Sequence, residues 1–590
     1  MKSTDTPKPR LTTPWTELAE SGRVETPYPR PHRVRDGWIC LNGDWDYAVL
    51  PGHSGPPNRW DGKIRVPFPI ESYLSGVQRA VSPSETLWYR NEIDVPQLPD
   101  GHRLLLHFEA VDWCAEVAVN GQPAGRHRGG FDPFCCDLTP FVEGESGTKT
   151  LELTVAVTDP TDTGSQPRGK QTLEPKGIWY TAVTGIWQTV WLEVVPACSI
   201  RDLDIQVDAF EGLVQLRAEL DGSGAASIRW SCPTEDGSFH TNSEPYCTAE
   251  IRIETPRRWS PDDPHLYPLE VELLDADGLV LDRVTSYFAL RSVSVGKGPS
   301  GLPCMLLNGE PIFPFGPLDQ GWWPDGLLTP PCDDALLYDI VTTRRLGFNL
   351  IRKHVKVEPA RFYHHCDRLG ILVWQDIPNG HAPGETIRPE ALSDVERSPE
   401  AQAQFEAELS AIIRSRRHFP CIVTWVPYNE GWGQCLTEHV TSLVRALDPT
   451  RLCNSTSGWT DRGVGDFLDV HRYPGPLMEV GDGSRIPVLG EFGGLGLPIP
   501  GRLWQQENNW GYRGYSELTE FRDAYSALLT QLEPLIRSGL AAAVYTQTTD
   551  VEGEVNGLLT YDRQELKLDQ DSACRRHTAL IRAFQDGPDV

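Results

Sequence analysis

The chain has 590 residues, of which 39% are hydrophobic and 23% are charged, ordinary values for a globular protein with several domains. Its formal net charge of −28 argues against nucleic acids and anionic membranes as partners, because both bind basic surfaces. No segment approaches the roughly 18 consecutive apolar residues of a membrane span, so we expect no membrane partner.

The segment 1–34 is predicted to be an N-terminal arm. It is polar and rich in proline, without the apolar stretch of a secretory signal, and we expect it to lie extended over the first domain. The 14 cysteines are scattered, and no CxxC pair has metal-ligand spacing. Unpaired cysteines without a signal predict reduced thiols and a cytoplasmic protein.

Two β-rich regions follow the arm. Residues 35–196 contain short runs such as WICLNGDWDYAV, HRLLLHFEAV and LELTVAVTD, separated by turn signals that include Asn120-Gly121. This pattern predicts an antiparallel sandwich. Residues 197–295 show the same pattern of short β-runs and turns over about a hundred residues. This predicts an immunoglobulin-like sandwich, although the Cys-Trp-Cys signature is missing.

Residues 296–590 change to strands that alternate with amphipathic helices. CDDALLYDIVTTRRLG leads into FNLIRKH, PARFYHHCDRLG into ILVWQD, and SPEAQAQFEAELSAIIRSRRH into CIVTWVPYNE. With PIFPFG at the start and four later runs, about eight strands result, which predicts a (β/α)8 barrel. A doubly wound open sheet is the alternative, but no glycine-rich phosphate loop follows the first strand.

Polar side chains gather at the predicted strand ends, where barrel enzymes carry their chemistry. In chain order they are Arg352, His354, Asp376, Asn429, Glu430, His471, Tyr473, Glu491 and Tyr545. Two are glutamates on opposite sides of the barrel. Glycoside hydrolysis needs two carboxyl groups, one that protonates the leaving oxygen and one that attacks or activates water.

The electrostatic roles of these residues follow from general rules. If Glu430 and Glu491 lie close in a partly dry site, the charge of one raises the pKa of the other and keeps it protonated near neutral pH. Arg352 would instead keep a neighbouring nucleophile ionised, and Tyr473 could donate a hydrogen bond to it. A carboxyl separation of about 5 to 5.5 Å gives retention, and about 6.5 to 9.5 Å gives inversion.

Further side chains are candidates for sugar binding. Asp319, in the loop DQGWWPDG after the first strand, could accept hydrogen bonds from sugar hydroxyls. Trp432 and Trp459 could stack on the C–H faces of a sugar. Structural roles explain the two histidines and Asp376 equally well. The loop NGHAPGETIRPE is rich in proline and glycine and could form a rim of the site.

The chain resembles glycoside hydrolase family 2, the family of β-galactosidases, β-glucuronidases and β-mannosidases. The resemblance covers nearly the whole chain and is carried by GIWYTAVTGIWQTVWLE, LNGDW, RRWSPDDPHLYPLEVEL, FNLIRKH, DRLGILVWQD, VPYNEGWG and VLGEFGG. It implies a jelly-roll sandwich, an immunoglobulin-like sandwich and a C-terminal (β/α)8 TIM barrel.

The resemblance also implies roles for residues. Glu430 matches the acid/base, Glu491 the nucleophile, and Asn429 the residue that binds the sugar 2-hydroxyl. Arg352 and Tyr473 match the supports of the nucleophile. The implied reaction is hydrolysis of a terminal sugar with retention, through a covalent glycosyl-enzyme. No organic cofactor is implied, and no ligand cluster supports a metal. Dimers are common among relatives, which leaves a homo-oligomer open.

Departures from the family pattern leave the sugar open. No Asn-x-Lys motif follows Glu491, which disfavours a uronic acid, and Tyr545 or Gln547 stands where many relatives carry a tryptophan. A β-galactoside is slightly favoured over an arabinoside or a galactofuranoside. A transglycosylase would use the same residues, a metal-dependent hydrolase would need convergent ligands, and an inactive sugar-binding protein would need neither glutamate.

Overall fold

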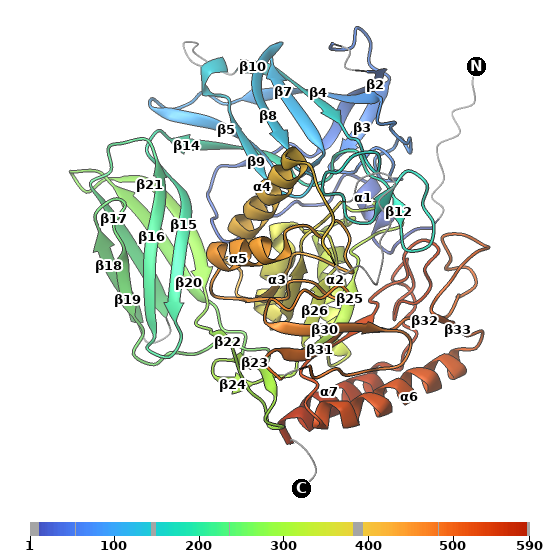
Figure 1. The fold of residues 1–590 in the computed structure, drawn as a ribbon. Coiled ribbons are helices and arrows are strands. Elements are labelled where there is room, and N and C mark those ends of the chain that lie inside the picture. The colour runs from blue at the N-terminus through green and yellow to red at the C-terminus, as the bar shows by residue number, and fades with distance from the viewer. Residues whose placement is uncertain are drawn as a thin grey trace, which may run out of the picture.

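The computed structural model describes residues 11–52, 55–142, 149–234, 237–380, 393–481 and 483–586. Two β-sandwiches pack around a central α/β barrel, one against its upper end and one against its side in the view of Figure 1. Most of the loop NGHAPGETIRPE, predicted to form a rim, lies outside the described residues. Within them, no helix is both long and apolar enough to cross a bilayer.

The N-terminal segment differs from the expected extended arm. It contains helix α1 (Thr16–Glu20) and packs on the barrel as well as on the first sandwich. The Thr13 hydroxyl donates to the Asp325 carboxylate at 2.7 Å, and the Trp15 ring meets Trp323 edge-on at 6.1 Å. The expected packing on the first domain is present, and the contacts of Thr13 and Trp15 with a buried carboxylate and an indole of the barrel are additional to it.

The first sandwich consists of a four-stranded and a six-stranded antiparallel sheet, in the orders β1-β14-β5-β9 and β3-β2-β4-β10-β7-β8. Its strands are β1 (Ile39–Cys40), β2 (Gly43–Pro51), β3 (Gly62–Val66), β4 (Glu85–Val95), β5 (His102–Phe108), β7 (Cys114–Val119), β8 (Gln122–Arg128), β9 (Phe134–Asp137), β10 (Lys149–Thr158) and β14 (Val190–Pro196). The Asn120-Gly121 turn between β7 and β8 has φ values of 49° and 75°, as a tight hairpin requires.

Short pairings at the barrel side of this sandwich join β6 (Val111–Asp112) to β13 (Gly185–Ile186) and β11 (Gln171–Thr172) to β12 (Tyr180–Thr181). The first pair is antiparallel and the second is parallel. Between β10 and β11 the chain runs toward the barrel, so residues of the sandwich reach the barrel mouth.

The second sandwich packs a three-stranded sheet, β15-β16-β19, against a four-stranded sheet, β18-β17-β20-β21. The strands are β15 (Ser199–Asp208), β16 (Leu213–Asp221), β17 (Ser227–Thr234), β18 (Gly237–Ser243), β19 (Ala249–Arg252), β20 (Tyr267–Leu274) and β21 (Val280–Phe288). Trp230 is fully buried at its centre. All fourteen cysteines lie in the described part of the chain, and all are free thiols.

A small sheet connects this sandwich to the barrel. It contains β22 (Val293–Lys297), β23 (Pro303–Leu307) and β24 (Glu310–Pro311). The predicted boundary between 295 and 296 therefore falls inside β22. The run PIFPFG, expected to be the first barrel strand, begins in this sheet, and the barrel strand itself starts only at Phe315.

Eight parallel strands form the barrel in the order β29-β28-β27-β26-β25-β34-β31-β30, so that β29 and β30 are the two strands not paired with each other around the ring. They are β25 (Phe315–Asp319), β26 (Leu350–Lys353), β27 (Leu372–Asp376), β28 (Ile422–Val426), β29 (Leu452–Cys453), β30 (Phe467–Arg472), β31 (Ile486–Gly493) and β34 (Ala543–Thr546). Around them lie α2 (Asp333–Arg345), α3 (Ala360–Leu369), α4 (Pro399–Arg416), α5 (Thr437–Leu447), α6 (Leu518–Arg537) and α7 (Gln570–Asp586).

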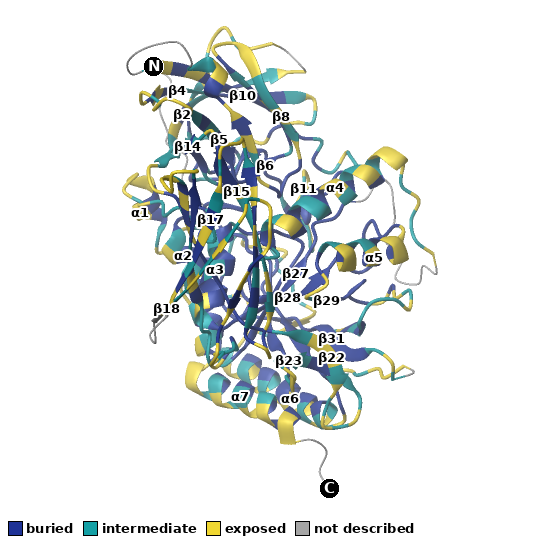
Figure 2. Ribbon diagram, turned by 90° about the vertical axis from the view of Figure 1, so that its left-hand side faces the viewer, coloured by how far each residue is buried: buried dark blue, intermediate teal, exposed yellow. Residues whose placement is uncertain are grey.

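Burial explains why these segments adopt the barrel. The barrel strands are buried in their interior while the helices expose one face, as Figure 2 shows for α4, α6 and α7. Helix α4 begins at a proline after Ser398, whose hydroxyl accepts from the Ala401 amide at 3.2 Å. Its predicted stripe, from Phe405 to Ile413, is buried against the barrel.

Candidate active site

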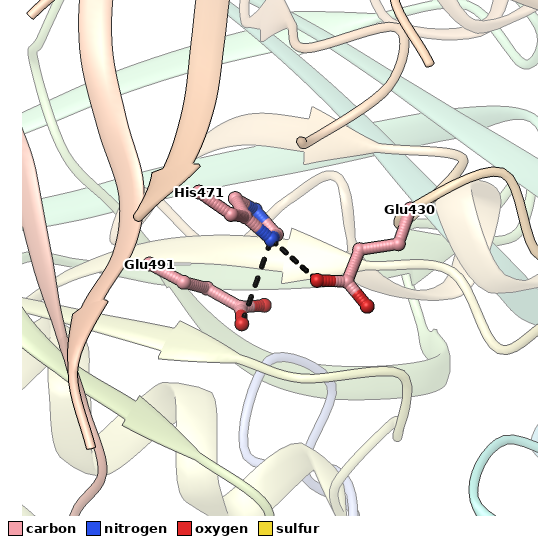
Figure 3. A group of neighbouring side chains, drawn as sticks. All are labelled: Glu430, His471 and Glu491. Carbon is pink, nitrogen blue, oxygen red and sulfur yellow. Dashed lines mark hydrogen bonds and ion pairs between the residues drawn. The ribbon is translucent and has the colours of Figure 1, made fainter. Parts of the chain in front are cut away.

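Three side chains meet in the barrel mouth: Glu430, which follows β28, His471 of β30 and Glu491 of β31 (Figure 3). The Nδ1 atom of His471 lies 2.8 Å from Oε1 of Glu430 and 3.5 Å from Oε2 of Glu491. One oxygen of each glutamate and this nitrogen all lie within 4.8 Å of one another. All three residues are buried. The sequence-predicted pair of carboxylates is therefore in contact through one imidazole.

Glu430 is held by the backbone that follows β28. Its amide donates to the Ser457 carbonyl at 2.8 Å, and Asn429 forms an isolated parallel bridge with Ser457. The φ of Glu430 is 53°, a left-handed conformation that costs free energy for a residue other than glycine. The surrounding hydrogen bonds thus hold a strained backbone that aims this carboxyl group inward.

Glu491 stands in β31, where a close approach to β30 requires the glycine before it. The Gly490 amide donates to Oδ1 of Asp469 at 2.7 Å. A Cβ at position 490 would lie 2.2 Å from the same oxygen, far inside van der Waals contact. A glycine is therefore required directly before Glu491, and Asp469 fixes the backbone from which its side chain projects.

The Glu491 carboxylate is stabilised in its ionised form. Tyr473 donates its hydroxyl to Oε2 at 2.5 Å, and Nη1 of Arg352 donates to Oε1 at 3.3 Å. Burial by itself raises the pKa of Glu491, but the charges of His471 and Arg352 outweigh it and lower the pKa to about 2. Glu491 is accordingly an anion at neutral pH.

Arg352 organises several of the predicted residues at once. Its fully buried guanidinium donates to both oxygens of Asp376 at 3.1 and 3.0 Å and to Oδ1 of Asn429 at 2.7 Å. The planar fork of donors fixes these groups relative to Glu491. The Nδ2 group of Asn429 has no hydrogen-bond partner among the described residues, so its donors remain for a ligand.

The protonation of His471 follows from its partners. The Ser457 hydroxyl donates its only hydrogen to Oδ2 of Asp469 at 2.6 Å, so Nε2 of His471, 2.8 Å from Ser457 Oγ, must donate to Ser457. The Nδ1 atom donates to Glu430 and forms an ion pair with Glu491. Burial lowers the pKa of His471, but Glu491 and Glu430 outweigh it and raise the pKa above its usual value. His471 is therefore a cation between two carboxyl groups.

The remaining predicted residues at this end lie around that centre. Nδ1 of His354 is 2.8 Å from Oδ2 of Asp376, and burial holds the pKa of His354 well below its usual range, so it is neutral. The ring of Trp432 lies 6.0 Å from His354. Trp459 meets His471 edge-on at 5.5 Å and is 42% exposed, the position of a rim residue.

Two predicted sugar ligands have contacts within the protein. Asp319 accepts from Nζ of Lys353 at 2.7 Å and from the Gly321 amide at 2.9 Å, so one of its oxygens is in a buried ion pair and the other is bound by the backbone. Tyr545 is fully buried and packs on Phe492 and on the ring of Tyr525 in α6. It points outward because alternate residues of a strand face opposite sides.

Sequence reasoning missed several residues of the site. The next residue of β34, Thr546, faces inward with its Oγ1 2.8 Å from the Tyr473 hydroxyl, which strand alternation could have indicated. Tyr512 stacks on Tyr473 with ring centroids 3.5 Å apart, but it comes from a loop without periodicity. Ser457 and Asp469 were missed because their roles depend on His471. Lys170 reaches the site from the sandwich domain.

The same three residues also bear on metal binding. Glu430, His471 and Glu491 form the group within the described ranges whose ligand atoms are close enough to hold an ion. Since Nδ1 of His471 carries a proton toward the carboxylates, the set is satisfied by its own ion pairs. We therefore assign it no metal.

Comparisons with known proteins match each domain in turn. The family model "Glycosyl hydrolases family 2, sugar binding domain" matches residues 39–196, "Glycosyl hydrolases family 2" matches 198–291, and "Glycosyl hydrolases family 2, TIM barrel domain" matches 332–472.

Two curated relatives show the range of names in this group. A β-galactosidase of Thermoanaerobacter pseudethanolicus is 25% identical over 363 residues, 57% of this chain and 44% of the relative. A putative β-glucuronidase of Formosa agariphila is 26% identical over 388 residues, 63% of this chain and 34% of the relative. The chain thus spans less than half the length of these two proteins.

Solved structures resemble the chain over nearly its whole length. A β-D-glucuronidase of Dictyoglomus thermophilum has a TM-score of 0.74 at 18% identity, covering 93% of this chain and 98% of that one. Bifidobacterium dentium β-glucuronidase has a TM-score of 0.72 at 20% identity, with the same coverage. At these identities the likeness concerns the fold. The three successive domain matches show that the chain belongs to glycosyl hydrolase family 2.

Proposed function

We propose that this protein is a retaining, exo-acting glycosidase that removes a terminal sugar by double displacement. The observation that carries the proposal is the short separation of two carboxyl groups, whose nearest ligand oxygens on Glu430 and Glu491 lie within 4.8 Å. Retaining enzymes bring their carboxyl groups to about 5 to 5.5 Å, whereas inverting enzymes leave room for a water between them.

In the first step, Glu491 is the nucleophile. Its ionised carboxylate attacks the anomeric carbon, while Glu430 donates its proton to the departing glycosidic oxygen. The bond from the anomeric carbon to that oxygen breaks as the bond to Glu491 forms. Tyr473 and Arg352 hold the attacking carboxylate in place through the hydrogen bonds described above.

In the second step, Glu430 acts as a base. It now carries a negative charge and takes a proton from a water that attacks the anomeric carbon on the face the aglycone has left. The ester bond to Glu491 breaks, and the sugar departs with its original configuration. His471 donates a hydrogen bond to Glu430 and forms an ion pair with Glu491, so its charge can offset whichever carboxyl group is charged in each half-reaction.

The same site also bears on which terminal sugar the protein binds. The unpartnered amide of Asn429 suits a hydroxyl next to the anomeric carbon. The curated relatives include proteins named β-galactosidase and putative β-glucuronidase, which leaves two sugars in competition. We propose a β-galactoside first, with an arabinoside or a galactofuranoside as the alternative.

A panel of nitrophenyl glycosides tests this function. It should contain β-galactopyranoside, β-galactofuranoside, β-glucuronide, β-mannoside and both α-L-arabinosides, each assayed with the wild type and with Glu491→Gln. We expect one strong substrate, whose hydrolysis the variant loses while its thermal unfolding stays the same. Hydrolysis that persists in Glu491→Gln would refute the assignment of the nucleophile. No hydrolysis of any glycoside would favour a sugar-binding protein.

A further inference from the structure

One charged side chain near the two glutamates has no part in the proposed mechanism. Lys170 belongs to the first sandwich, yet its Nζ lies 5.5 Å from the ring centroid of Trp432 in the barrel. The same nitrogen is 5.7 Å from the ring of Tyr180. The residue is 6% exposed. A lysine is rarely this buried without a partner that explains it.

The loop that carries Lys170 is fixed on the barrel. The amides of Arg168 and Gly169 both donate to the Asn379 carbonyl, at 3.1 and 3.0 Å. Gly169 has a φ of 63°, and a Cβ there would lie 2.5 Å from the Val355 carbonyl oxygen. Only glycine permits this contact between the domains. Lys170 is thus held in place before any ligand arrives.

The other side of Lys170 is fixed by the sandwich. Its carbonyl accepts from the Tyr180 amide at 2.9 Å, next to the pairing of β11 with β12. In Figure 1, β12 lies where the first sandwich meets the barrel loops. The backbone of this lysine is therefore anchored to both domains, and its side chain extends over the aromatic rings toward the barrel mouth.

A carboxylate from a barrel loop accompanies this cation. Glu554, in the loop after β34, is 2% exposed. It accepts from the Tyr180 hydroxyl at 2.5 Å and from Nδ2 of Asn556 at 2.9 Å. Each of its oxygens still has a lone pair for a further donor.

Lys170 interacts electrostatically with Glu554 and Glu491, without a hydrogen bond or ion pair to either. Within the described residues, the contacts of Nζ of Lys170 are with the rings of Tyr180 and Trp432 and include no hydrogen bond or ion pair, so its three donors are unused. Burial raises the pKa of Glu554, and the charge of Lys170 opposes this increase. The same charge contributes to the lowered pKa of Glu491. The ammonium of Lys170 therefore favours the ionised form of each of these two carboxyl groups.

We propose that Lys170 and Glu554 form a donor and acceptor pair that binds adjacent hydroxyls of a neutral sugar, which makes the sugar site a composite of two domains. The inference rests on the proposed function, because both members of the pair interact electrostatically with the proposed nucleophile Glu491. An ammonium donates to a hydroxyl oxygen, and a carboxylate accepts from the neighbouring hydroxyl. A uronic acid would add another carboxylate beside Glu491 and Glu554, so the pair selects against it.

Steady-state kinetics on the best nitrophenyl glycoside, and on its monodeoxy analogues, test the pair. Lys170→Met keeps an apolar side chain of similar length but removes the ammonium over Trp432, while Lys176→Met removes an exposed lysine from the same loop. We expect Lys170→Met to lower kcat/KM by roughly 10- to 100-fold, as the loss of a hydrogen bond to a charged group does. Lys176→Met should stay within about twofold of the wild type.

The deoxy analogues identify the contact. Removing the hydroxyl that Lys170 binds should cost the wild type a similar factor but cost Lys170→Met little more, since the partner is already gone. If Lys170→Met does not fold, as judged by thermal unfolding, Lys170→Arg and Glu554→Gln provide the same comparison. A Lys170→Met variant equal to Lys176→Met would overturn the proposal. So would a preference for the β-glucuronide that Lys170→Met abolishes.

A binding measurement tests the Lys170–Glu554 pair independently of whether the protein hydrolyses a glycoside. The sugar is titrated into Glu491→Gln, alone and combined with Lys170→Met, with tryptophan fluorescence as the signal, because Trp432 lies beside Lys170. Weakened binding in the double variant supports the pair even if the wild type hydrolyses no glycoside. Unchanged binding contradicts the pair even if hydrolysis is found.

Discussion

The imidazole of His471 lies between the two catalytic candidates, with Nδ1 2.8 Å from Glu430 and 3.5 Å from Glu491. Ser457 and Asp469 hold its other nitrogen, so the ring cannot turn away without breaking that chain. A single cation thus contacts both carboxyl groups. This arrangement keeps the two carboxyl groups close together and stabilises the ionised form of Glu491.

Replacing His471 should change the pH dependence of activity. The His471 charge lowers the pKa of Glu491 toward 2, and an uncharged glutamine removes that effect. Because Glu491 must be ionised to attack, the acidic limb of the kcat/KM profile should move up by roughly 1 unit or more in His471→Gln. His240→Gln, at an exposed histidine of the second sandwich, is the control. An acidic limb at the same pH in both variants would contradict this role.

Glu430→Ala should separate substrates by their leaving groups. An aryl glycoside with a poor leaving group needs the proton, and its kcat/KM should fall by roughly 100- to 10,000-fold. A dinitrophenyl glycoside departs without it and should lose far less in the glycosylation step. The comparison of the two substrates is the measurement, and equal losses for both would exclude Glu430 as the acid.

Tyr473→Phe removes the hydrogen bond of 2.5 Å to Glu491 without changing the shape of the ring. The stack on Tyr512 should preserve the fold, so we expect kcat to fall by roughly 10-fold or more while the unfolding temperature stays close to that of the wild type. Tyr246→Phe, at a tyrosine that is 56% exposed in the second sandwich, is the matched control. An equal kcat in the two variants would show that Tyr473 does not support the nucleophile.

The contact between sandwich and barrel can be tested with two glycines of the same backbone conformation. Gly169 and Gly22 have φ values of 63° and 64°, but a Cβ meets the Val355 carbonyl at 2.5 Å only at position 169. Gly169→Ala should therefore lower the free energy of unfolding by about 1 to 3 kcal/mol more than Gly22→Ala does, and should reduce kcat/KM. Denaturant unfolding, followed at the first transition, measures the difference. Equal losses would mean that the domains adjust freely at this contact.

Much of the fold was accessible from the sequence because it rests on periodic patterns. The barrel follows from short apolar runs that alternate with amphipathic helices, and the buried stripe of α4 follows from helical spacing. The start of the first barrel strand was missed because PIFPFG is apolar throughout and fits either a hairpin or a barrel strand. The packing of Trp15 on the barrel was missed because a single aromatic residue in a polar segment has no period.

The residues of the site also fall into those that the sequence pattern could predict and those that it could not. Glu430 and Glu491 could be found because each ends a strand of a recognisable barrel. The positions of Asp319 and Tyr545 were misjudged because the sequence does not show which side chains a lysine or a helix will cover. Lys170 stands more than 250 residues before Glu430 and comes from another domain, so its place beside Trp432 depends on how two domains dock.

The most direct test of double displacement is to trap the covalent glycosyl-enzyme and to identify the residue that carries the sugar. The wild type is incubated with the 2-deoxy-2-fluoro glycosyl fluoride of the sugar it cleaves, and its intact mass and peptides are then recorded. We expect one added fluoroglycosyl unit per chain, located on Glu491, because the 2-fluorine slows both steps while the good fluoride leaving group speeds only the attachment. An adduct on another residue, or turnover of the reagent with no adduct and an inverted product, would contradict double displacement at Glu491.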